Sequence, residues 1–199
     1  MSFHPTMAYG ATFHKSARTL TEPGEPFDYT PERRARFDVV VQRYPPDQRR
    51  SAVLPALYLV QDQQGYITAN AMRYVAGLLG ITAADVEDVV SYYTMFFTKP
   101  VGTYVLSVCR TLSCALNGAE RVTEEICDAL GITPGATDAT GTFTLLEVEC
   151  LGACDRAPVI MINDAWQEHQ RPEDVRRLLD DVRTRGEAAL TGCHHVIEK

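Results

Sequence analysis

The chain has 199 residues, carries 26 acidic and 19 basic side chains for a net charge of −7, and is 45% hydrophobic. This composition is typical of a globular protein with enough apolar residues for one sizeable core or two small ones, and it excludes collagenous and disordered classes. The most apolar window, residues 51–60, is too short to cross a bilayer, and residues 1–20 lack the apolar core of a secretory signal. We therefore expect a cytoplasmic protein with no direct membrane insertion and, because it is acidic without long basic runs, no nucleic-acid partner.

The acidic excess lies entirely in the second half of the chain. Residues 1–99 carry 10 acidic and 10 basic groups, whereas residues 100–199 carry 16 and 9. This asymmetry predicts two units with different roles. Residues 1–29 show no hydrophobic periodicity and predict a flexible N-terminal arm.

Residues 30–98 carry the signals of a small helical bundle. Thr30 and Pro31 provide an N-cap and a proline in the first turn of the first helix. A second helix is expected over about residues 47–61, with a kink or a later start because of Pro55.

Two further helices complete the predicted bundle. Thr68 is the expected N-cap of the third, and Gly80 is its expected stop. Thr82 and Asp85 have the spacing of a capping box at the start of the fourth.

The spacing of apolar residues changes over residues 102–184. The new pattern predicts a compact α/β domain of thioredoxin type, followed by a tail over residues 185–199. Its expected order is strand, helix, strand, two strands joined by a tight turn, and helix. These elements are expected at residues 103–108, 115–130, 142–148, 159–162, around Trp166, and from Pro172 onward.

Four of the six cysteines form two local pairs in this acidic half. Cys109 and Cys114 make a C-x4-C loop after the first predicted strand, and Cys150 and Cys154 make a C-x3-C loop after the second. If these strands are parallel, both loops leave the same end of the sheet and their sulfurs meet there. In a reducing compartment such clustering favours metal or redox chemistry over disulfides.

A cluster of two irons and two sulfides needs four thiolates, two on each iron, and soft sulfur ligands select it over harder-ligand metals. Gly152 and Ala153 leave little bulk between the second pair, so backbone N–H groups can approach the sulfurs. For an all-cysteine centre in acidic surroundings we expect a low reduction potential, roughly −400 mV.

Other interpretations of the same cysteines remain open. A structural zinc site also takes four cysteines, although its usual C-x2-C spacing fits less well, and it would make the chain an interaction module without a redox role. Two disulfides would need an oxidising compartment, and a thioredoxin-like dithiol would need a C-x-x-C motif that is absent from the sequence.

Several segments, in order, closely resemble the E subunit of NADH:quinone oxidoreductase, the respiratory complex I. They are CRTLSC at 109–114, EVECLGACDRAP at 147–158, YYTMFF at 92–97, RSAVLPAL at 50–57 and GYI at 65–67. The resemblance covers roughly residues 30–183. Trp166 with the following QEHQ, and the tail from Thr191, depart from the family pattern.

The resemblance implies a helical bundle joined to a thioredoxin-like [2Fe-2S] ferredoxin domain, with one cluster on Cys109, Cys114, Cys150 and Cys154. It implies a subunit of an oxidoreductase that exchanges single electrons with the FMN of a neighbouring NADH-binding flavoprotein subunit during NADH oxidation and quinone reduction. Other partners would be further subunits of the peripheral arm. The sequence has no glycine-rich phosphate fingerprint, so we expect FMN only in the partner and no catalytic residues here. Related subunits also occur in NAD-linked formate dehydrogenases and NAD-reducing hydrogenases.

The remaining candidates favour ordinary structural roles. Cys127 is expected to be a buried, inert thiol and Cys193 to lie in an unstructured tail. The aromatic residues at 92, 93, 96 and 97 favour core packing between the two units over the alternative of an exposed docking face. Arg110 and Arg156 are equally consistent with solvated side chains and with countering the charge of the cluster.

Overall fold

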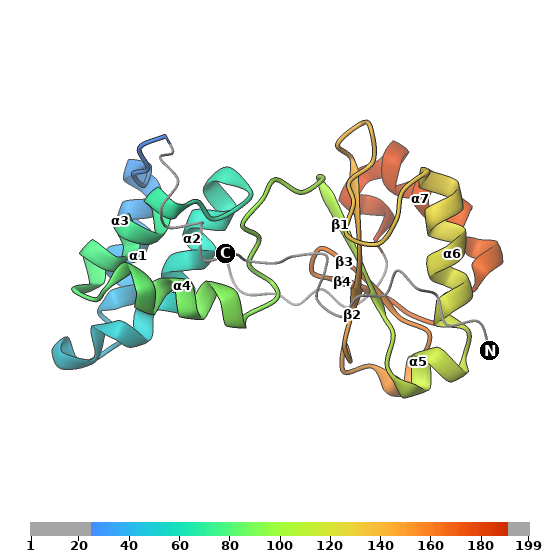
Figure 1. The fold of residues 1–199 in the computed structure, drawn as a ribbon, viewed down its shortest axis with the longest axis horizontal. Coiled ribbons are helices and arrows are strands. Elements are labelled where there is room, and N and C mark those ends of the chain that lie inside the picture. The colour runs from blue at the N-terminus through green and yellow to red at the C-terminus, as the bar shows by residue number, and fades with distance from the viewer. Residues whose placement is uncertain (1–24, 191–199) are drawn as a thin grey trace. The chain divides into compact units, whose positions relative to one another are not determined.

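The computed structural model describes residues 25–190, in two compact units that divide between Pro100 and Val101 (Figure 1). The first unit is helical, and the second combines helices with a mixed sheet, which confirms the expected fold class. The helices of the first unit are α1 (Pro31–Val41), the 3-10 helix η3 (Pro46–Ala52), α2 (Val53–Gln64), α3 (Ala69–Leu79) and α4 (Ala83–Tyr92).

Threonine N-caps start three of these helices, as the sequence predicts. The hydroxyl of Thr30 accepts a hydrogen bond from the backbone N–H of Arg33, and that of Thr68 accepts one from Ala71. The capping box of Thr82 and Asp85 is complete in both directions. These helix starts are local features, and each relieves backbone N–H groups that the helix itself cannot satisfy.

The second predicted helix differs from its expected form. Residues 46–52 form η3, and α2 begins only at Val53. Pro55 therefore lies in the first turn of α2, where its missing N–H costs nothing, so the proline is accommodated by a later start.

Apolar side chains from all four α-helices form the core of the first unit. Tyr29 belongs to this core, and its hydroxyl donates to the backbone oxygen of Ala56 over 2.7 Å. The part of the predicted arm over residues 25–29 is thus packed on the helices, whereas residues 1–24 lie outside the described residues. Of the aromatic group, Phe96 is buried, while Tyr92 is 79% exposed.

The second unit contains a four-stranded sheet in the order β2-β1-β3-β4. β1 and β2 are parallel, and β3 is antiparallel to both β1 and β4. Helices α6 and α7 lie on one side of the sheet in Figure 1 and pack against each other. The elements are β1 (Tyr104–Cys109), α5 (Leu112–Leu116), α6 (Ala119–Leu130), β2 (Phe143–Val148), η4 (Cys154–Arg156), β3 (Ile160–Ile162), β4 (Ala165–Gln167), η5 (Pro172–Asp174), α7 (Val175–Arg185) and η6 (Gly186–Ala189).

The helix expected over residues 115–130 is wrong in its first part, because the structure has two helices there. α5 ends at Leu116, and α6 starts at Ala119 after Gly118, whose φ of +91° is a left-handed conformation that glycine adopts readily. The break lets the short α5 take a direction of its own at the end of the sheet.

The end of the second unit extends past residue 184, where the predicted domain stops. α7 continues to Arg185, and Ala189 and Leu190 are buried in the core of this unit. The rest of the predicted tail, residues 191–199, lies outside the described residues. Among residues 25–190, no helix has both the length and the apolar character needed to span a bilayer.

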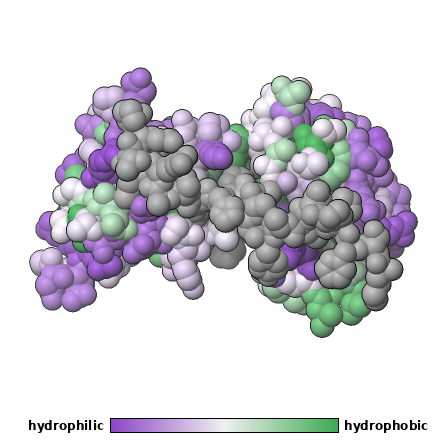
Figure 2. Space-filling view, viewed as in Figure 1, coloured by the Kyte–Doolittle hydropathy of each residue, from purple (hydrophilic) through white to green (hydrophobic). Residues whose placement is uncertain are grey.

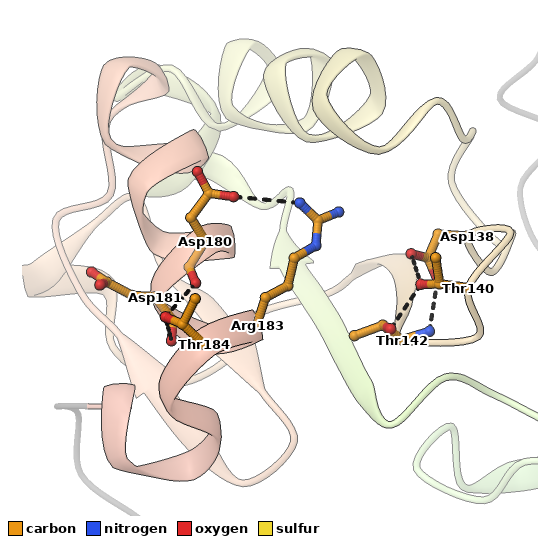
Figure 3. A network of polar contacts seen from close by, with 7 residues as sticks. All are labelled: Asp138, Thr140, Thr142, Asp180, Asp181, Arg183 and Thr184. Atoms are coloured by element: carbon orange, nitrogen blue, oxygen red, sulfur yellow. Dashed lines mark hydrogen bonds and ion pairs between the residues drawn. The ribbon is translucent and has the colours of Figure 1, made fainter.

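Asp138 fixes the loop that leads into β2. One oxygen of its carboxylate accepts hydrogen bonds from the backbone N–H groups of Thr142 and Phe143, and the other accepts one from the hydroxyl of Thr140. Figure 3 shows the hydrogen bonds with Thr140 and Thr142. Burial raises the pKa of Asp138, but these hydrogen bonds outweigh it and hold the pKa below its ordinary value. The start of β2, and with it the register of the parallel pair, is therefore anchored by one carboxylate.

Candidate metal centre

The two cysteine loops leave the same end of the sheet. Cys109 is the last residue of β1 and lies opposite Val148, the last residue of β2, in the parallel register. The backbone N–H of Arg110 donates to the backbone oxygen of Val148 over 3.0 Å, and that of Cys109 donates to the backbone oxygen of Val159 over 3.2 Å. Because Cys150 follows β2 by two residues, the parallel pairing itself brings the loops together.

Short helical turns position the other two cysteines. Cys114 lies in α5, where its side chain is buried, and Cys154 is the first residue of η4. Between the second pair, Gly152 has a φ of +79°, and its backbone N–H donates to Cys150 Sγ over 3.4 Å. The sequence predicts such a donor from Gly152 and Ala153, and the glycine provides it.

Within each loop the two sulfurs lie close together. The Sγ atoms of Cys150 and Cys154 are 3.3 Å apart, and the thiol of Cys109 interacts with that of Cys114. Across the loops, the charge of Cys109 acts on both Cys150 and Cys154, and that of Cys154 acts on Cys114. Each thiol of one pair is therefore within electrostatic reach of at least one thiol of the other pair.

In each pair one thiol is favoured as the thiolate. Burial raises the pKa of Cys109, but hydrogen bonds from Thr111 reverse this and leave it lowered. The N–H of Gly152 lowers the pKa of Cys150. Burial and the bond to Cys109 raise the pKa of Cys114 to about 11, and the bond to Cys150 raises that of Cys154. Each loop thus favours one thiolate even before a metal adds its own charge.

The donor set fits a two-iron cluster. Four soft sulfur ligands arranged as two close pairs match the requirement of two thiolates on each iron. Within the described part of the chain, no group of three or more His, Cys, Asp or Glu side chains is placed to hold a metal ion. Cys109 and Cys114 are buried, whereas Cys150 and Cys154 are exposed, so a cluster on these four would have one face toward the core and one toward the surface.

Nearby charges pair within the chain. Arg110 forms an ion pair with Glu149 over 3.6 Å, and Arg156 pairs with Asp155 and Glu168. Both arginines therefore flank the cysteine loops, each already paired with local carboxylates.

Two exposed leucines flank Cys114 on α5. Leu112 is 75% exposed and Leu116 is 78% exposed, although both are large apolar side chains. Figure 2 shows a hydrophobic patch over this part of the second unit. Sequence periodicity predicts one core-facing helix over residues 115–130, so it misses these leucines and the hydroxyl of Thr111. In the sequence, these three residues are marked only by their position next to Cys109 and Cys114.

Of the other two cysteines, only Cys127 lies in the described part of the chain, and it is not part of this group. Cys127 lies in α6, where its side chain packs against the core and burial raises its pKa. Cys193 lies outside the described residues.

Comparison with known proteins gives consistent matches. Residues 37–183 match the family model described as thioredoxin-like [2Fe-2S] ferredoxin. The E subunit of NADH-quinone oxidoreductase from Pseudomonas aeruginosa is 44% identical over 131 residues, covering 66% of this chain and 79% of that protein. The same-named protein of Mycobacterium tuberculosis is 39% identical over 165 residues.

The mycobacterial match covers 81% of this chain but only 65% of the relative, so the chain spans about two thirds of that protein's length. Among solved structures, a crystal structure of an air-oxidized NAD+-reducing [NiFe]-hydrogenase superposes with a TM-score of 0.59 at 19% identity. That superposition covers 67% of this chain and 23% of the hydrogenase chain, and it supports the fold alone.

Proposed function

Because this chain belongs to the thioredoxin-like [2Fe-2S] ferredoxins, in the family of the NADH-quinone oxidoreductase E subunit, we propose that it is a one-electron carrier in a NADH dehydrogenase module. Its cluster would be held by Cys109, Cys114, Cys150 and Cys154. The observation that supports this proposal is that both cysteine pairs follow the parallel strands β1 and β2 at the same end of the sheet.

When bound, the cluster supplies one reversible electron-accepting site. The chain's own residues then have three tasks. The two loops hold the sulfurs in place through the paired strands, the buried side around Cys109 and Cys114 keeps water away, and the N–H of Gly152 donates toward the sulfur of Cys150. No residue of the chain needs to make or break a covalent bond of a substrate.

We further propose that the electron is exchanged with the FMN of a neighbouring NADH-binding flavoprotein subunit. Leu112 and Leu116 support this, because exposed apolar side chains beside a redox centre are typical of a docking surface. The exposed position of Cys150 and Cys154 leaves a route for the electron on the same side of the domain. The other peripheral-arm subunits, and the use of quinone as final acceptor, belong to the same proposal.

The proposal is tested on anaerobically purified protein. We expect two irons and two acid-labile sulfides per chain, a red-brown colour that bleaches with dithionite, and an electron paramagnetic resonance signal of the reduced form. Cys114→Ala should abolish the cluster, whereas Cys127→Ala should retain full iron and sulfide, since Cys127 lies elsewhere on α6. Colourless protein containing one zinc per chain, or full iron in Cys114→Ala, would refute the proposed ligand set.

The partner is tested separately by mild affinity purification from native cells. Recovery of a flavoprotein with bound FMN supports the docking proposal. A cluster-loaded chain that never copurifies with a flavoprotein contradicts it and leaves the ligand set intact.

A further inference from the structure

Among residues 25–190, four helices begin directly after a threonine, but one of these threonines does not cap its helix. Thr30, Thr68 and Thr82 each accept a hydrogen bond from a backbone N–H of the first turn, over 3.4, 3.2 and 3.1 Å. Thr111, which precedes α5, makes no such side-chain cap. The hydroxyl of Thr111 is therefore not used to cap the helix that follows it, although this is the usual role of a threonine at that position.

The hydroxyl of Thr111 instead lies beside the sulfurs. Its Oγ1 atom is 3.3 Å from Cys109 Sγ, and it also interacts with the thiol of Cys150 in the other loop. A cysteine that ligates iron is a thiolate and has no proton to donate, so the hydroxyl must then be the donor. The contact that the geometry establishes is the one between Thr111 Oγ1 and Cys109 Sγ.

Such a donor affects the two redox states unequally. Four thiolates, two ferric irons and two sulfides carry a formal charge of −2, and uptake of one electron makes it −3. A hydrogen-bond donor at sulfur stabilises the more negative state more strongly, so it raises the reduction potential.

On the basis of the proposed cluster, we propose that Thr111 is a positioning residue that raises the reduction potential by donating its hydroxyl hydrogen bond to Cys109 Sγ. The short α5 keeps its start without the cap, since the backbone oxygen of Thr111 still accepts from the N–H of Ala115 over 2.9 Å.

The test is a dithionite redox titration, followed by electron paramagnetic resonance, of the full-length chain and three variants. Thr111→Val keeps the shape of the side chain and removes the donor, whereas Thr111→Ser keeps the donor. Thr68→Val removes a genuine cap in the first unit and serves as the matched control.

We expect Thr111→Val to have about a tenfold smaller reduced-to-oxidised ratio at a fixed potential, a midpoint shift of about −59 mV for one electron. Thr111→Ser should titrate like the parent chain, and Thr68→Val should lower the unfolding midpoint without moving the potential. If Thr111→Val does not assemble the cluster, Thr111→Ala is titrated in its place.

An unchanged midpoint potential in Thr111→Val, or equal shifts of the midpoint potential in Thr111→Val and Thr111→Ser, overturns the role of Thr111. Iron and sulfide content is measured on every sample. A parent chain without two irons would instead refute the proposed function, so the two failures are distinguishable.

Discussion

The backbone N–H of Gly152 donates to the sulfur of Cys150 from a residue whose φ is +79°. This left-handed conformation aims the N–H back at the preceding cysteine. A Cβ atom added at Gly152 would meet nothing within 4 Å, so space does not restrict the position. The requirement for glycine there is conformational.

Gly152→Ala should therefore weaken the cysteine loop without a steric clash. A left-handed conformation costs an alanine about 1–3 kcal/mol, which we expect to appear as lower stability and faster loss of the cluster. Gly65→Ala is the matched control, because Gly65 has a φ of +83° and equally open space in the first unit. Cluster lifetime, followed by absorbance in air, should fall only in Gly152→Ala. Equal lifetimes in the two variants would contradict a conformational role at the cysteine loop.

Gly102 is required for a different reason, which is close packing. A Cβ atom at this position would lie 2.9 Å from backbone atoms of Phe143 and Thr142, which cannot move aside as a side chain could. Gly102→Ala should cost about 1–3 kcal/mol of unfolding free energy, measured by urea denaturation. In contrast, Gly77→Ala on the exposed side of α3 should stabilise the chain by roughly 0.5–1 kcal/mol. A tolerated alanine at 102 would mean that β2 can shift.

Asp138 should make stability depend on pH in the acidic range. Its folded pKa is below the ordinary value, so the stability that it contributes is complete above the unfolded pKa of about 3.9. That contribution is lost as the pH falls through the folded pKa, because the protonated carboxyl is a weaker acceptor for the N–H groups of Thr142 and Phe143.

Asp138→Asn should accordingly be less stable than the parent chain at pH 7 by roughly 1.5–3 kcal/mol, the usual range for hydrogen bonds to a charged group. The difference should shrink toward pH 2. Asp180→Asn is the control, since Asp180 is exposed and pairs with Arg183 only at the surface, where an ion pair contributes about 0–1 kcal/mol. A difference that is constant from pH 7 to pH 2 would exclude the carboxylate as its source.

The exposed leucines of α5 should matter for binding and not for folding. Leu112→Glu combined with Leu116→Glu should reduce affinity for the flavoprotein subunit about tenfold or more, which corresponds to about 1.4 kcal/mol. The unfolding midpoint and the cluster content should stay unchanged, because neither side chain is buried in the described structure. Val39→Glu is the control, since Val39 is 59% exposed on α1. Unaltered binding of the double variant would remove α5 from the docking surface.

Much of the fold was predictable because its signals are local. Thr68 and Gly80 delimit α3, and Thr82 with Asp85 starts α4, because a cap involves only residues within one helical turn. The two cysteine pairs were also visible, since their spacing is a property of the chain. The family resemblance carried by these segments is confirmed by the 44% identical relative and by the family model over residues 37–183.

Other features depend on contacts between distant residues, and no local pattern contains them. Tyr29 is fixed by the backbone of Ala56, 27 residues away, so a segment that looks irregular in sequence is packed in the core. The break at Gly118 turns one apparent helix into two, and this places Leu112 and Leu116 at the surface. Periodicity alone cannot distinguish an apolar side chain that faces the core from one that faces a partner.

The order of residues along the chain dictates which chemical groups are available at the proposed metal centre: four sulfurs in two pairs, with small residues between the second pair. How these groups are used depends on the folded arrangement. The parallel pairing of β1 and β2 brings the pairs together, and it leaves the hydroxyl of Thr111 facing sulfur where a cap would otherwise form. A hydrogen-bonding side chain binds the partner that tertiary packing brings within reach, and the local sequence alone does not determine which partner that is.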